Sequence, residues 1–223
     1  MFKRGYIFDL DGTLVNSYPE IHKAFALALA ETGEPPIPES RLAPLVGTSM
    51  STVLDELFPD WLDEQRGTFR QTFGDAYDSF CHQSLPFEGA GRVLDALQGR
   101  YVIVSNKPRL WSERLVTALG WQPLALICPG ATLARKPSPD MLIEGGRCLR
   151  NAGNVETILT IGDSLVDQLA AKRANLPFFQ VAWSYHRTMC DGVVTTWAEF
   201  LSEIDTHAGG SNVYLGASGL SRD

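Results

Sequence analysis

The stretch GYIFDLDGT at residues 5–13 decides the fold. It begins with a short run of β-branched and aromatic residues, which is typical of a strand, and it ends at an Asp-Gly pair, which signals a turn. We therefore predict a strand over residues 5–8 that runs into a polar loop. This loop carries two carboxylates, those of Asp9 and Asp11.

Four further apolar runs share this character, and small or polar residues follow each of them: residues 101–104, 124–127, 157–161 and 178–182. The segments between them repeat apolar residues at helical spacing. Continuous apolar strands that alternate with helices indicate a parallel sheet buried on both faces. The sequence thus predicts an α/β protein with a doubly wound, Rossmann-like parallel sheet, whose ligand site lies at the carboxyl ends of the strands.

Residues 16–85 break the alternation, because they hold helical stretches and no convincing strand. Two apolar stripes at helical spacing mark the first and last of these stretches, and we interpret both as core: Ile21, Phe25, Ala28, Leu29 and Phe69, Phe73, Tyr77, Phe80. We predict a catalytic core of residues 1–15 and 86–205 with an inserted all-helical cap of residues 16–85. The small, polar residues 206–223 are expected to form a flexible tail.

Composition limits the class of protein. The 223 residues are 44% hydrophobic and 20% charged, which predicts a globular fold and excludes a wholly disordered or collagen-like chain. The net charge of -7 argues against a generally basic surface that would bind nucleic acid or an anionic membrane. The chain starts with neither a signal peptide nor a membrane span, so we expect a soluble, cytoplasmic monomer or homodimer without nucleic acid or membrane partners. The four cysteines form no CxxC pair and are expected to be reduced structural thiols.

Four polar sites follow or lie near the predicted strands. The first is the loop from Asp9 to Thr13, the second is Ser105-Asn106, the third is Lys136 and the fourth is Gly162-Asp163-Ser164-x-x-Asp167. Each alone has an ordinary structural explanation, as a turn, a loop or a helix cap. Their joint occurrence, in order and at strand ends, indicates a single site suited to a phosphate group.

The acidic residues of this set point to a metal ion. The carboxylates of Asp9, Asp11, Asp163 and Asp167 would repel one another at one end of the sheet, and their pKa values would rise, unless a cation lay among them. Magnesium favours oxygen ligands and is commonly held by one or two carboxylates plus a substrate phosphate. We therefore predict Mg²⁺ as the cofactor.

These four motifs, in this order and spacing, resemble those of the haloacid dehalogenase superfamily. The resemblance covers most of the chain, from Phe8 to Asp167. The insert resembles the cap of the phosphoglycolate phosphatase-like branch, with supporting stretches at residues 15–21, 45–47, 105–108 and 135–139. An aspartate at position 11 is similar to the phosphoryl-transfer members and disfavours dehalogenation.

The resemblance implies a role for each residue. Asp9 is expected to be the nucleophile and Asp11 the general acid and base, with Ser105 and Lys136 completing the catalytic set. Phosphate binding is assigned to Thr13, Ser105, Asn106 and Lys136. The metal ligands are expected to be Asp9, the backbone carbonyl of Asp11, and Asp163, while Asp167 orients a water molecule or Lys136.

The activity implied is hydrolysis of a small phosphomonoester, such as 2-phosphoglycolate or a sugar phosphate, through an aspartyl-phosphate. A phosphomutase and a pyrophosphatase use the same core and remain alternatives, as does a non-enzymatic phosphate sensor. Three features depart from the branch: Asn16, the pair Gly145-Gly146 in a segment that should be helical, and Trp183-Ser184-Tyr185-His186. Lys107 and Arg135 flank the motifs and are candidates for contact with an anionic substrate.

Overall fold

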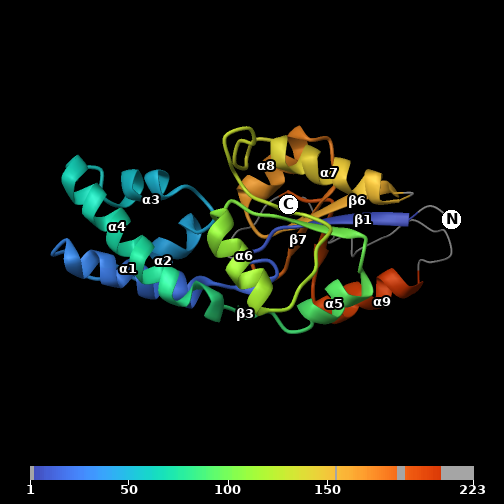
Figure 1. Ribbon diagram of the computed structural model, residues 1–223, viewed down its shortest axis with the longest axis horizontal. Helices are drawn as coiled ribbons and strands as arrows, with labels where there is room; N and C mark the ends of the chain where they lie inside the picture. Colours follow the sequence, from blue (N-terminus) through green and yellow to red (C-terminus); the bar gives the residue numbers. More distant parts are fainter. Residues whose placement is uncertain (1–2, 154, 185–188, 207–223) are drawn as a thin grey trace, which may run out of the picture.

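The computed structural model describes residues 3–153, 155–184 and 189–206. It has two lobes: the helices α1 to α4 form one, and an α/β unit forms the other (Figure 1). The strands are β1 Lys3–Phe8, β2 Val15–Asn16, β3 Leu85–Pro86, β4 Tyr101–Val104, β5 Leu126–Ile127, β6 Val155–Gly162, β7 Phe178–Val181 and β8 Gly192–Val194. The α-helices are α1 Tyr18–Glu31, α2 Glu39–Leu42, α3 Met50–Leu57, α4 Asp63–Phe80, α5 Ala90–Ala96, α6 Arg109–Ala118, α7 Asp140–Ala152, α8 Leu165–Arg173 and α9 Trp197–Thr206. Two short 3₁₀ helices lie at Ala43–Leu45 and Cys81–Gln83.

The main sheet has six parallel strands in the order β5-β4-β1-β6-β7-β8. The chain builds outward from β1 to β4 and β5, then returns to the other side of β1 at β6. The strand order therefore reverses between β1 and β6, and in open α/β sheets this switch point is where ligands bind. This topology confirms the predicted doubly wound Rossmann-like core.

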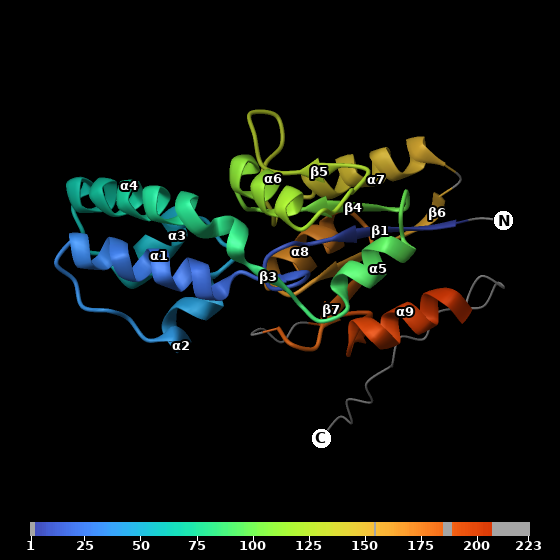
Figure 2. The same cartoon turned by 60° about the horizontal axis from the view of Figure 1, so that its bottom comes forward.

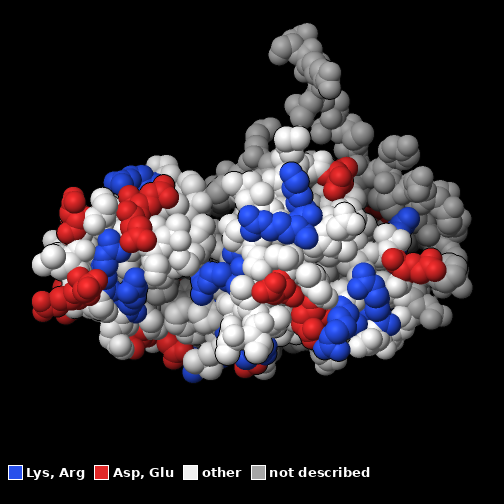
Figure 3. Space-filling model, turned by 90° about the horizontal axis from the view of Figure 1, so that it is seen from above, with Lys and Arg blue, Asp and Glu red and all other residues white. Residues whose placement is uncertain are grey.

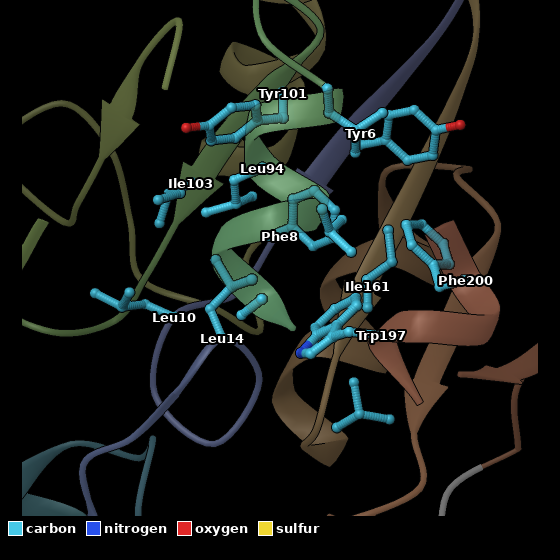
Figure 4. Close-up of a cluster of buried hydrophobic side chains, with 14 of the residues drawn as sticks. Tyr6, Phe8, Leu10, Leu14, Leu94, Tyr101, Ile103, Ile161, Trp197 and Phe200 are labelled. Carbon is cyan, nitrogen blue, oxygen red and sulfur yellow. The ribbon is translucent and has the colours of Figure 1, made fainter. Parts of the chain in front are cut away.

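Helices cover both faces of the sheet, as the two ribbon views agree (Figures 1 and 2). On one face, β1, β4 and β6 contribute alternate residues to a cluster with α5, α6 and α9, in which Phe8, Leu94, Trp197 and Phe200 lie together (Figure 4). On the other face, α7 and α8 pack on the remaining strand residues, among them Ile7. Burial on both faces explains why the strands are continuously apolar in sequence.

The helical lobe has a hydrophobic core of its own. The two stripes recognised in the sequence face each other there, and Phe25 of α1 lies against Phe69 of α4 with ring centroids 4.7 Å apart. The lobe joins the α/β unit through a two-stranded antiparallel sheet in which Val15 pairs with Pro86 and Asn16 with Leu85. The sequence did not indicate these short strands. We refer to this lobe as the cap; the division into domains at residues 16 and 85 stays a prediction.

Several other expectations can be compared with the described residues. Helix α9 extends to Thr206, and the rest of the predicted tail lies outside the described part of the chain. All four cysteines are free. No helix among the described residues has the length and apolar character that crossing a bilayer requires. On the face shown in Figure 3, basic and acidic side chains are interspersed over both lobes.

Helix α7 runs through Gly145 and Gly146 without a break, and both residues are buried. A Cβ atom at Gly145 would lie 3.1 Å from Val102 Cγ2 and 3.4 Å from Ile7 Cδ1. The glycine therefore lets the helix approach β1 and β4 more closely than a larger residue would allow. The apparent departure from a helical sequence is a packing requirement.

This packing predicts opposite effects at two helical glycines. Gly145→Val should lower the free energy of unfolding by about 2 kcal/mol, because the side chain overfills the space between α7 and the sheet. Gly67→Ala in α4 should raise it by about 0.5 to 1 kcal/mol, because a Cβ there meets nothing within 4 Å and alanine favours the helix. Urea unfolding of both variants checks this. An unchanged stability of Gly145→Val would contradict the close-packing explanation.

Candidate active site

The polar residues singled out in the sequence meet at the carboxyl ends of the central strands. Asp9 follows β1, Ser105 and Asn106 follow β4, Asp163 follows β6, and Lys136 lies in the loop between β5 and α7. They line one cavity of about 300 Å³, together with Asp11 and Asp167 and with residues of the cap. The site thus lies at the switch point of the sheet and is covered by the cap.

Lys136 is the most connected residue of the site. Its ammonium lies 2.6 Å from Asp9 Oδ1 and 2.5 Å from Asp167 Oδ1, and it also donates to the carbonyl oxygen of Val104 at 3.0 Å. Only 4% of Lys136 is exposed. Burial alone would lower the pKa of this lysine, but the charges of Asp167 and Asp9 outweigh it and hold the pKa above its ordinary value.

Asn106 fixes Lys136 through the backbone. Its Oδ1 accepts a hydrogen bond from the Lys136 amide at 2.8 Å, and its Nδ2 donates to the Lys136 carbonyl oxygen at 3.0 Å. The same Nδ2 also lies 3.0 Å from the carbonyl oxygen of Gly47 in the cap. Ser105 is buried beside it, and its Oγ accepts from the Lys107 amide at 3.1 Å. Asn106 therefore holds together the lysine loop, the end of β4 and the cap.

Three carboxylates converge where β1 and β6 end. One oxygen of each of Asp9, Asp163 and Asp167 lies within 4.8 Å of the other two. Burial raises the pKa of Asp9 to about 7, against the opposing charge of Lys136. Burial also raises the pKa of Asp163 well above its usual range, and the charges of Asp167 and Asp9 add to this.

The three acids differ in how their oxygens are used. Asp167 is fully engaged, because Oδ1 pairs with Lys136 and Oδ2 accepts from the amide and hydroxyl of Ser164. Asp163 forms no ion pair within the described part of the chain, and its carboxylate accepts a long 3.4 Å hydrogen bond from Thr13. Asp9 Oδ2 accepts a similar 3.4 Å bond from Thr13. Asp9 and Asp163 are therefore the two acids with oxygens available to a cation.

Two glycines make room for these carboxylates. Gly12 has a φ of +82°, and a Cβ atom there would collide with the Asp163 carboxylate. A Cβ at Gly162 would lie 2.7 Å from the Asp167 Cβ. Gly12 thus allows a close approach between the loops after β1 and β6, and Gly162 allows the first turn of α8 to pack closely against the end of β6.

The divergent residues at 183 and 184 support the same loops. Trp183 Nε1 donates to the carbonyl oxygen of Gly12 at 3.1 Å, and the Ser184 hydroxyl bonds to the carbonyl oxygen of Asp163. Gln180 donates to that same carbonyl at 3.2 Å. Tyr185 and His186, the other residues of this departure, lie outside the described residues. We did not predict from the sequence that residues 180–184 reach the site.

Asp11 has a partner that the sequence identified only as a flanking residue. Lys107 Nζ lies 2.7 Å from Asp11 Oδ1 and donates to the hydroxyl of Tyr77, a residue of cap helix α4, at 2.5 Å. Burial would lower the pKa of Lys107, but the neighbouring Asp11 and Tyr77 hold it above its ordinary value. The predicted core role of Tyr77 holds for its ring, which is buried in the cap, whereas its hydroxyl reaches across to the other lobe.

Arg135 and Thr13, two further residues predicted to contact the substrate, differ in burial. Arg135 lines the cavity but is exposed, as is Arg70 of the cap. Thr13 is fully buried and contacts the carboxylates of Asp9 and Asp163 instead of facing open solvent.

The signal that could have revealed Lys107 is its position directly after Ser105-Asn106, at the end of a strand. Tyr77 gave no such signal, because helical periodicity shows only the buried face.

The fold and the site define a hydrolase of the haloacid dehalogenase-like family. The family model described as haloacid dehalogenase-like hydrolase matches residues 6–181, so the chain belongs to this family. Family membership and the predicted class of enzyme are thereby confirmed.

Relatives place the chain within the family. It is 32% identical to a phosphoglycolate phosphatase of Xylella fastidiosa over 209 residues, which cover 91% of this chain and 90% of that protein. It is 28% identical to an N-acetylmuramic acid 6-phosphate phosphatase of Pseudomonas aeruginosa, with 82% and 83% covered. The fold is similar to that of a hydrolase from Pseudomonas syringae, with a TM-score of 0.75, 22% identity, and 92% and 99% of the two chains covered. The predicted phosphoglycolate phosphatase-like branch is confirmed.

The contacts of Lys107 predict energetic coupling between cap and core. Either substitution, Lys107→Met or Tyr77→Phe, removes the same buried hydrogen bond to a charged group, so the double mutant should lose less stability than the sum of the two single mutants. The double-mutant cycle should give a coupling free energy of about 1.5 to 3 kcal/mol. Denaturant unfolding measures it. The exposed pair Arg109 and Glu113, 3.1 Å apart on α6, is the matched control and should couple by about 0.5 kcal/mol or less. Equal coupling in the two cycles would contradict the prediction.

Proposed function

We propose that this protein is a magnesium-dependent phosphatase that hydrolyses a small phosphomonoester through an aspartyl-phosphate on Asp9. One observation carries the proposal: the carboxylates of Asp9, Asp163 and Asp167, of which Asp9 and Asp167 are buried, share the switch point of the sheet with the buried ammonium of Lys136. When all are ionised, this set has two negative charges in excess. That imbalance matches a divalent cation, whereas a site without one would force the acids to take up protons.

The donor set fits magnesium. The available groups are carboxylate oxygens of Asp9 and Asp163, with the backbone carbonyl of Asp11 as a third ligand, and no histidine or cysteine among the described residues lines the cavity. Hard oxygen ligands of this kind suit Mg²⁺ better than zinc or copper. When bound, the ion would neutralise charge on the phosphoryl oxygens and lower the repulsion between phosphate and nucleophile. Asp167 has both oxygens engaged by Lys136 and Ser164, so we assign it to positioning the lysine.

The chain's own residues divide the reaction into two steps. A carboxylate oxygen of Asp9 attacks phosphorus, the ester bond breaks, and Asp11 gives a proton to the departing alkoxide oxygen. Asp11 then takes a proton from water, which attacks the aspartyl-phosphate and releases inorganic phosphate. The Lys136 ammonium, already beside Asp9, would stabilise negative charge on the phosphoryl oxygens in both transition states.

The other residues hold the substrate and exclude water. The Ser105 hydroxyl and backbone amides of the loops after β1 and β4 would donate to phosphoryl oxygens. The cap covers the site and is fixed to it through Asn106 and Gly47 and through Lys107 and Tyr77. The phosphatases among its relatives act, by their names, on phosphoglycolate and on N-acetylmuramic acid 6-phosphate, so these two compounds are natural first substrates to test.

The proposed mechanism predicts metal-dependent release of phosphate that requires Asp9. Purified protein should release inorganic phosphate from a phosphomonoester when Mg²⁺ is present, and Asp9→Asn should reduce kcat at least a thousandfold because the nucleophile is lost. Asp95→Asn, on the exposed face of α5, is the control and should retain activity. Release that persists in Asp9→Asn would exclude the covalent mechanism. Isotopic transfer of the phosphoryl group to a second sugar hydroxyl, in place of water, would identify a phosphomutase.

A second prediction concerns pH and metal. The pKa of Asp9 is raised from an ordinary value of 3.8 to about 7 in the folded protein, so the folded protein binds an extra proton between these pH values. Without metal, stability should therefore fall as pH rises from about 4 to 7, by at most about 4 kcal/mol from this group. Mg²⁺ should reverse most of this fall, because it favours the ionised carboxylate.

Thermal unfolding in EDTA and in Mg²⁺, at pH 5 and pH 7, tests this linkage. The increase in Tm on adding Mg²⁺ should be larger at pH 7 than at pH 5. Asp9→Asn removes the titrating group and should reduce the difference between the two pH values. A metal effect that is equal at both pH values in the unmodified protein would count against a metal site built on Asp9.

A further inference from the structure

The cavity that contains the catalytic residues continues deep into the cap. Its far walls are apolar and come from all four cap helices and the short 3₁₀ helix between α2 and α3: Phe25, Leu42, Leu45, Met50, Val53 and Phe73. Four of these, Phe25, Leu42, Val53 and Phe73, are less than 9% exposed and belong to the hydrophobic core of the cap, so the apolar wall is continuous with that core. One end of the cavity is therefore strongly polar and the other is hydrophobic.

The few polar groups on the cap wall already have partners. Thr48 Oγ1 donates to the carbonyl oxygen of Leu45 at 2.6 Å, and the Tyr77 hydroxyl accepts from Lys107. Arg70, the one cap residue with a charge among those that line the cavity, is exposed and donates to Ser51 Oγ at 3.2 Å. A charged or heavily hydroxylated leaving group would lose water against these walls with little compensation.

The volume also exceeds what a two-carbon leaving group needs. A cavity of about 300 Å³ has room equivalent to about ten water molecules, at roughly 30 Å³ each. It lies at the lower end of the roughly 300 to 1,000 Å³ range of small-molecule sites. The phosphoryl group would occupy the polar end, among Asp9, Ser105 and Lys136, and most of the remaining space faces carbon atoms.

We infer that the substrate is a phosphomonoester whose leaving group carries a compact apolar portion, of about four to eight carbons, that packs against the cap wall. The inference rests on the proposed phosphatase function and narrows its substrate. Burying this portion removes apolar surface from water and helps to order the reacting phosphate beside Asp9. A short carboxylate such as phosphoglycolate would leave the apolar walls in contact with trapped water.

A series of unbranched alkyl phosphates tests the inference, because the leaving oxygen stays chemically the same while the apolar portion grows. With Mg²⁺ present, kcat/KM should rise about fourfold per methylene from ethyl to hexyl phosphate, which is the factor expected for about 0.8 kcal/mol per buried methylene. Hexyl phosphate should exceed 2-phosphoglycolate and a hexyl phosphate that ends in a carboxylate by at least tenfold. A flat series, or a preference for either carboxylate, would overturn the inference.

Two variants locate the effect in the cap. Met50→Gln places a polar group of similar size on the cavity wall and should reduce the rise per methylene to less than twofold. Leu27→Gln, on the exposed side of α1 and outside the cavity, should leave the rise unchanged. Melting curves of both variants show that they are folded. An unchanged rise in Met50→Gln would overturn the assignment to this wall.

Binding separates this inference from the proposed function. Alkylphosphonates cannot be hydrolysed, so calorimetric titration of the unmodified protein with ethyl- and hexylphosphonate measures the apolar contribution without turnover. Hexylphosphonate should bind at least tenfold more tightly. Activity with no chain-length preference in rate or binding would leave the phosphatase intact and overturn the apolar site. Tighter hexylphosphonate binding without any metal-dependent phosphate release would support the apolar site and overturn the phosphatase function.

Discussion

The ion pairs of Lys136 are the constraint on which the rest of the site depends. Asp9 and Asp167 both contact its ammonium, and all three groups are buried, Asp9 after β1, Asp167 in the first turn of α8 and Lys136 in the loop before α7. Without this lysine, three carboxylates within 4.8 Å of one another would face a strong penalty of desolvation and repulsion. The lysine compensates one of the three charges. The remaining excess of negative charge is the basis for the cation that we propose at this site.

The scaffold keeps this lysine in place through contacts that are mostly to the backbone. Asn106 brackets the Lys136 peptide from both sides, and the carbonyl oxygen of Val104 accepts from its ammonium. Both of those residues belong to β4 or follow it directly, next to β1 in the sheet. The strand pairing of β1 with β4 and β6 therefore sets the distances between Asp9, Lys136 and Asp163. A parallel sheet with helices on both faces is rigid enough to hold such a charged cluster together.

Most of the fold and of the candidate site could be predicted from the sequence, but contacts between distant segments could not. Strand ends could be identified because continuous apolar runs stop at small polar residues, and so Asp9, Ser105 and Asp163 were placed correctly at one edge of the sheet. The Lys107 contact with Tyr77 could not be found in the same way, since it joins segments 30 residues apart whose relation is set by the packing of the cap. Trp183 was noticed only as a departure, because an indole that donates to a backbone carbonyl of another loop leaves no local pattern. Gly145 and Gly146 departed from a helical sequence for a different reason. The low helix propensity of glycine is outweighed by close packing, because a Cβ atom at Gly145 would lie only 3.1 Å from Val102 Cγ2.

The cap links the electrostatics of the site to the choice of substrate. Its apolar residues remove water from one end of the cavity, and the same exclusion of water strengthens every charge interaction at the other end. Burial raises the pKa of Asp9 at one end of the cavity, and the apolar wall around Phe25 and Phe73 forms the other end. A leaving group that fills the apolar end also displaces water that would otherwise solvate the phosphate. Substrate fit and transition-state stabilisation are then consequences of one packing arrangement, and the contacts of Asn106 and Lys107 with the cap hold that arrangement on the catalytic residues.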